Sequence, residues 1–140
     1  MGAFAGMCNT DGDGNTYIGF GAGQNAKGGG SAYNFYGGYN AGKVACFTCA
    51  DGPTGGSCNI YMGMNAGANR AGGTNNVLLG RFAGFSNSTG TNNIGFGNGA
   101  LMFNVTGGGN FAGGYLTLTQ NTTGSSNVAI GRGAMKSNTT

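Results

Sequence analysis

Few residues in this chain could carry out chemistry. It contains no histidine, and its acidic residues are three aspartates, Asp11, Asp13 and Asp51. General acid–base or nucleophilic catalysis needs an ionisable side chain held within hydrogen-bond reach of the reacting group. These aspartates fall in glycine-rich stretches that predict turns, so no oriented catalytic pair is indicated. We therefore expect a protein that is not an enzyme.

The segment Asp11-Gly-Asp13-Gly-Asn15 places oxygen ligands at alternate positions, as calcium-binding loops do. In such loops the sixth place is glycine and the twelfth is glutamate. Here those places hold Thr16 and Ala22. We favour an ordinary glycine turn and expect no cofactor, with calcium at Asp11 and Asp13 as the weaker alternative.

Four cysteines are present, Cys8, Cys46, Cys49 and Cys58. An even number allows disulfides, with three possible pairings. We expect Cys58 to pair with Cys46 or Cys49, and the remaining cysteine to pair with Cys8 in the same or another copy. The alternative is zinc, since Cys46-x-x-Cys49 has ligand spacing, but no second close pair and no histidine complete such a site. No βαβ pattern surrounds this pair, which argues against a thioredoxin-type role.

Four Asn-x-Thr sequences recur every 17 residues and are candidate glycosylation sites. They begin at Asn87, Asn104, Asn121 and Asn138. If the units stack, these residues form one longitudinal stripe that could carry glycans. The interpretation we favour is a turn repeated for backbone reasons, with Asn and Thr ladders that hydrogen-bond between units.

The same 17-residue spacing organises the whole chain. An asparagine marks each unit, followed four residues later by a glycine that we interpret as a corner of the repeat. The asparagines are Asn15, Asn34, Asn59, Asn76, Asn93, Asn110 and Asn127. The corner glycines are Gly2, Gly19, Gly38, Gly63, Gly80, Gly97, Gly114 and Gly131. A unit this short cannot bury its apolar side chains alone and must stack on a copy of itself. We therefore expect about eight coils in a single β-solenoid domain spanning residues 1–140.

Within each unit, three residues between the asparagine and the glycine alternate in character, as in Ile60-Tyr61-Met62 and Val128-Ala129-Ile130. Alternation predicts a short strand whose first and third residues point the same way. We expect a second short strand around Ala100 to Phe103 and its equivalents, and a core built from the two or three large apolar residues of each coil. The predicted fold is all-β, a parallel β-solenoid or β-roll.

The third unit is eight residues longer than the 17-residue repeat and contains three of the four cysteines, with a turn signal at Asp51-Gly52-Pro53. We expect it to leave the solenoid as a loop at about residues 43–58. The alternative for the whole chain is glycine-rich disorder, because there are 34 glycines and only 6% charged residues. The apolar residues fall in columns, however, so we favour an ordered solenoid.

Charge and the two ends bear on partners. The net charge is +3, and the six cations are scattered over different coils, so no phosphate-binding stripe and no nucleic-acid partner are expected. No apolar run is long enough for membrane insertion. Both termini interrupt a unit and neither resembles a polar cap. We expect either a piece of a longer repeat protein or a chain that stacks head to tail as an open homopolymer.

The motifs Asn76-Val-Leu-Leu-Gly80 and Asn127-Val-Ala-Ile-Gly131, each with Ala three residues after its glycine, resemble the 17-residue N-T-A-I-G repeat of bacterial and phage tail-fibre-domain proteins. They are also similar to the β-roll head repeats of trimeric autotransporter adhesins. The resemblance implies an extracellular location, on a cell or virion surface. The first expected function is a structural subunit of an extracellular fibre that stacks head to tail, as the two ends suggest, and whose Asn-x-Thr stripe could carry glycans along one face. The alternative to the head-to-tail polymer is a trimer. The second expected function is an adhesin or tail-fibre segment that binds host-surface glycans through the loop around Cys46 to Cys58, with Tyr33, Tyr36 and Tyr39 nearby.

Overall fold

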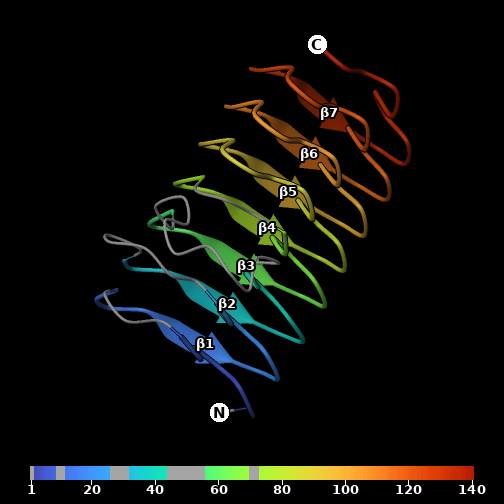
Figure 1. Cartoon of the computed structure of the whole chain (residues 1–140). Coiled ribbons are helices and arrows are strands. Elements are labelled where there is room, and N and C mark those ends of the chain that lie inside the picture. Colours follow the sequence, from blue (N-terminus) through green and yellow to red (C-terminus); the bar gives the residue numbers. More distant parts are fainter. Residues whose placement is uncertain (1, 9–11, 26–31, 44–55, 70–72) are drawn as a thin grey trace.

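A computed structural model gives the arrangement of the chain, and it describes residues 2–8, 12–25, 32–43, 56–69 and 73–140. Seven strands of three residues each are present in these segments, and no helix. The strands are β1 (Thr16–Ile18), β2 (Phe35–Gly37), β3 (Ile60–Met62), β4 (Val77–Leu79), β5 (Ile94–Phe96), β6 (Phe111–Gly113) and β7 (Val128–Ile130). They form one parallel sheet in chain order, and six turns of the solenoid connect the first strand to the last (Figure 1). The all-β parallel solenoid is confirmed.

The strands pair in register throughout. The middle residue of each strand lies beside the middle residue of the next, as in Tyr17 with Tyr36 and Tyr36 with Tyr61. This register holds across the two steps in the sequence that are longer than 17 residues. Most of the extra residues, including the predicted insertion loop apart from Lys43 and residues 56–58, lie outside the described segments.

The strand residues alternate as predicted, but the middle residue is the one that faces inward. Tyr36, Tyr61, Leu78 and Ala112 are fully buried. The first and third residues face outward, so the large apolar side chains expected in the core lie on the outside of the sheet. The interior is too narrow for them, because it already holds the middle residues and a column of small side chains, among them Ala22, Ala41, Ala66, Ala83 and Ala100.

Residues on opposite sides of each coil complement one another in volume. Where the strand supplies a large middle residue, the ninth place of the unit is glycine, and a Cβ there would collide with that residue. Gly42 meets Tyr36, Gly67 meets Tyr61 and Gly84 meets Leu78 in this way. Where the middle residue is small, as at Gly95 and Ala112, the ninth place holds a buried leucine, Leu101 or Leu118. The core is therefore filled from the strand in the early coils and from the opposite wall in the later ones.

The second strand expected around Ala100 to Phe103 does not form. Residues 98–103 make consecutive turns instead, with left-handed backbone at Gly99 (φ 69°) and Leu101 (φ 54°). A leucine in this conformation costs about 1–2 kcal/mol, and the cost is offset because the buried Leu101 side chain fills the core and its N–H donates to Thr117 O in the next coil at 3.0 Å. Each coil thus has one strand and one wall of turns.

A ladder of buried asparagines runs along the axis at the start of every strand. The Oδ1 of Asn93 accepts the backbone N–H of Asn110 at 3.0 Å and its Nδ2 at 3.1 Å. The Asn93 Nδ2 donates to Gly107 O at 2.8 Å. The same backbone contact to the preceding Oδ1 links Asn15, Asn34, Asn59, Asn76, Asn93, Asn110 and Asn127. Asparagine is needed because one side chain must accept from the following coil and donate to a carbonyl.

The ladder predicts which asparagine of a coil contributes to the stability of the fold. Replacing Asn93 with alanine removes three hydrogen bonds and leaves a buried N–H and a buried carbonyl with one partner fewer, so we expect a loss of about 3 kcal/mol in the free energy of unfolding. The control is Asn98→Ala in the same coil, an exposed residue outside both ladders, with an expected change within about 0.5 kcal/mol. Denaturant unfolding followed by circular dichroism measures both. Equal losses in the two variants would contradict the role of the ladder.

Candidate functional surfaces

The four candidate glycosylation residues form a second internal ladder. Asn87, Asn104 and Asn121 are buried, with relative exposures of 1% or less, and Asn138 is partly buried. Asn121 Nδ2 donates to Asn104 Oδ1 at 2.8 Å, and Asn138 Nδ2 donates to Asn121 Oδ1 at 3.0 Å. A glycan is attached through this nitrogen, and a folded coil leaves no room for it at the three buried positions. The burial of these three nitrogens argues against a glycan stripe on the folded chain, and glycosylation stays a prediction.

The two asparagine ladders share acceptors on the glycine turn between them. Gly107 O accepts from Asn93 Nδ2 and from Asn104 Nδ2, both at 2.8 Å. Gly124 O accepts from Asn110 Nδ2 and Asn121 Nδ2, also at 2.8 Å. The asparagine ladder of the favoured interpretation is present in these coils. A threonine ladder is not present among the described residues, where the hydroxyls of Thr122 and Thr123 donate to the Thr139 carbonyl and not to one another.

Two of the four cysteines lie in described segments. Cys8 and Cys58 are both exposed and both carry free thiols, so the structure does not show the disulfide that we expected at Cys58. Cys46 and Cys49, which include the CxxC pair considered for zinc, lie outside the described residues.

The possible calcium segment is only partly described. Asp11 lies outside the described residues, and Asp13 is exposed, its backbone carbonyl accepting the N–H of Tyr33 at 2.9 Å. In the part of the chain that the structure describes, no three histidine, cysteine or acidic side chains come together as metal ligands.

The three tyrosines proposed as a ligand-binding cluster are separated by the fold. Tyr36 is fully buried and its ring stacks on Tyr61, with centroids 5.0 Å apart. Tyr33 is 70% exposed and directly precedes Asn34 of the asparagine ladder. Tyr39 is half exposed after the glycine corner, where its ring stacks on Phe20 at 5.5 Å with an interplanar angle of 9°. The sequence spacing thus does not bring these side chains to one surface.

The most extensive functional candidate is the outside of the sheet, a surface that sequence reasoning missed. We call it the outer sheet face, defined as the first and third residues of all seven strands. They are Thr16, Ile18, Phe35, Gly37, Ile60, Met62, Val77, Leu79, Ile94, Phe96, Phe111, Gly113, Val128 and Ile130. None is charged and one is polar, yet Ile18, Met62 and Ile130 are 52%, 48% and 73% exposed. An exposed apolar surface of this continuity marks an interaction site more often than a solvated one. The signal available in the sequence was apolar residues on both sides of each strand's middle residue.

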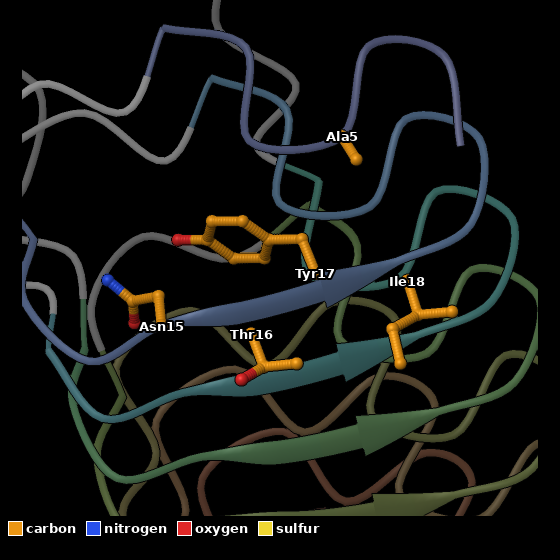
Figure 2. Close-up of a pocket in the computed structure, with 5 residues that line it drawn as sticks. All are labelled: Ala5, Asn15, Thr16, Tyr17 and Ile18. Atoms are coloured by element: carbon orange, nitrogen blue, oxygen red, sulfur yellow. The ribbon is translucent and has the colours of Figure 1, made fainter. Parts of the chain in front are cut away.

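A hollow of about 370 Å³ lies at the β1 end of the solenoid. It is lined by Ala5 from the first turn segment and by Asn15, Thr16, Tyr17 and Ile18. Figure 2 shows Tyr17 extending away from Thr16 and Ile18, toward the side on which Ala5 lies. Residues 2–8 stack on the turns of the next coil, for example through Gly6 N–H to Ala22 O at 2.8 Å. Residues 2–8 contain no strand, so among the described residues β1 pairs with β2 alone.

The two interpretations of the Asn-x-Thr stripe predict different effects from two changes that abolish the same sequence motif. Asn104→Ala should destabilise the fold by about 3 kcal/mol, because Asn104 is buried and donates to Gly107 O and Asn87 Oδ1 while accepting from Asn121. Thr106→Ala should change stability by no more than about 0.5 kcal/mol, because Thr106 is exposed. Denaturant midpoints of protein produced in a glycosylating host test this. If the motif serves a glycan, both variants lose the same added mass and the same stability.

No family model, no curated protein and no solved structure matches this chain. The structure has no helix in its described residues that is long and apolar enough to cross a membrane. The resemblance to tail-fibre and adhesin repeats thus stays an expectation from the motif. What the chain does has to be argued from the surfaces described above.

Proposed function

We propose that this chain is a structural subunit of an extracellular fibre, in which the solenoid continues head to tail from one copy into the next. The observation that supports the proposal is the polarity of the contacts between coils. At every step the later coil donates its asparagine N–H and the earlier coil accepts through Oδ1. A surface of this kind cannot pair with itself in the same way, but it fits the opposite end of an identical chain.

The last coil, residues 127–140, has the surface that earlier coils use to contact their successors. An added Cβ on Gly63 would meet the next corner carbonyl, Gly80 O, at 2.6 Å, whereas a Cβ on Gly131 would meet no atom within 4 Å. Asn127 donates to Asn110, and its own Oδ1 accepts no hydrogen bond from any described residue. The strand β7 pairs only with β6.

The first turn segment, residues 2–8, supplies matching groups for this surface. Gly2 occupies the corner place of its unit, so in a continued stack its backbone would lie over Gly131. Phe4 occupies the seventh place, with a left-handed φ of 60° close to the 53° of Leu116. Inside the chain, Leu116 sits against Gly99, which is the same pair of places that Phe4 and Gly133 would form. Gly133 has nothing within 4 Å of an added Cβ, and Phe4 is half exposed.

The second candidate function is a fibre segment that binds surface glycans. The exposed rings of Tyr33 and Tyr39 favour it, because amphipathic aromatic side chains are common at binding surfaces. Against it, the Tyr39 ring stacks face to face on Phe20, so one ring face is covered, and Tyr36 is buried. The subunit of a fibre therefore has the better support.

Electron microscopy of the purified chain tests the proposal. Rods should form with an axial repeat of roughly 40 Å, the height of eight coils at ~4.8 Å each. Gly131→Ala should keep the monomer folded, because its Cβ enters open space, and its main cost is the left-handed φ of 116°. In a rod, the same Cβ would meet the corner backbone of the next copy, so we expect rods to be abolished.

Lys136→Ala, an exposed change in the same coil, is the control and should leave rods intact. Circular dichroism confirms that each variant is folded. Discrete monomers of the unmodified chain, or rods of Gly131→Ala as long as those of the unmodified chain, would contradict head-to-tail stacking.

A further inference from the structure

The outer sheet face is a candidate surface for a lateral contact, at right angles to the solenoid axis. All of its large side chains lie on strands that pair in register, so they form two ranks running along the solenoid. Charged residues are absent from both ranks. The nearest arginines in the repeat, Arg81 and Arg132, lie two places beyond the face, with guanidinium groups over the rings of Phe82 (4.9 Å) and Tyr115 (5.6 Å).

Large and small side chains are paired within the strands of this face. Where the first residue of a strand is phenylalanine, the third is glycine, as in Phe35 with Gly37 and Phe111 with Gly113. The rings lie over these glycines, 3.4 Å and 3.5 Å from where a Cβ would stand. Strands that begin with a smaller aliphatic residue have a large third residue, such as Met62, Leu79 or Phe96. In the two strands that begin with phenylalanine, the ring of the first residue therefore covers the space beside the third.

The side chains of the outer sheet face repeat every ~4.8 Å along the axis, so they can pack against a surface with the same repeat. Side chains of two stacked sheets interdigitate when their spacings agree, and a second copy of this solenoid has the same spacing by construction. We propose that the outer sheet faces of two copies pack against each other, with the two sheets ~10 Å apart. The two ranks lie on one face of the sheet, so a single partner can cover both of them, which favours a pair over a ring of three.

The size of the face determines how strong this pairing is. Seven strands at ~4.8 Å and three residues at ~3.3 Å give a projected face of about 30 Å by 10 Å per copy. That is small beside the ~1,200–2,000 Å² that stable complexes bury. Single chains should thus pair weakly and in proportion to concentration, and copies already stacked end to end should pair strongly because their faces act together. Only this second, cooperative part rests on the proposed fibre function.

Replacing Met62 and Phe96 with lysine in one chain tests the pairing, because both are third-place residues of the face and 40% or more exposed. We expect at least a tenfold weaker self-association by analytical ultracentrifugation over a concentration series, and fibres one solenoid wide by electron microscopy. The matched control replaces Phe103 and Val105 with lysine, two similarly exposed apolar residues that belong to no strand. The control should associate like the unmodified chain.

A charge-swap experiment separates a contact from a loss of structure. A second variant carries glutamate at Met62 and Phe96, and mixing it with the lysine variant should restore association that neither shows alone. The proposal is overturned if the unmodified chain stays single at every concentration, if the lysine variant pairs like the unmodified chain, or if the assembly is threefold. Gly131→Ala distinguishes the two proposals, because it should prevent rods and still allow pairs.

Discussion

Every coil of this protein depends on its neighbours for its hydrogen bonds. From β1 to β6, the asparagine that precedes each strand accepts from the coil after it, and most of these side chains also donate to a glycine carbonyl. A single isolated coil would therefore leave several buried polar groups without partners. An unsatisfied buried group costs about 1–3 kcal/mol. Stacking at one fixed spacing is therefore the condition for folding, and it explains why the asparagine place is kept where the spacing between units is not.

The same fixed spacing decides which side chains fit inside. Corner glycines such as Gly63 and Gly80 have the carbonyl of the next coil where a Cβ would stand, so no larger residue can occupy that column. Away from the corner the constraint is on total volume. Tyr61 with Gly67 and Ala112 with Leu118 fill the same cross-section with opposite distributions of bulk. The narrow core accepts either arrangement, because only the sum across the coil matters for packing.

Much of the fold could be predicted from the sequence, because the recurrence of asparagine and glycine at 17 residues is a direct record of stacking. The interior could not be assigned with the same ease. Period-two alternation shows that Ile60 and Met62 share a side, but it does not say which side is the core when the middle residue, Tyr61, is equally apolar. The second strand failed for a related reason, since nothing in the alternation of Leu101 and its neighbours signals a left-handed backbone. The sequence did not show whether Asn104 is buried, because the same Asn-x-Thr motif is expected for an asparagine ladder and for a glycosylation site.

The two contact surfaces differ in kind, and this difference gives them separate roles. Contacts along the axis are polar and directional, as at Asn93, and fix both the register and the order of the coils. The outer sheet face is almost entirely apolar, so in the proposed pair it would contribute affinity along its whole length. In the proposed fibre, each copy that stacks on the end of the solenoid also lengthens the outer sheet face. Lateral packing should therefore follow elongation, because the apolar area that one copy presents is too small to hold a partner for long.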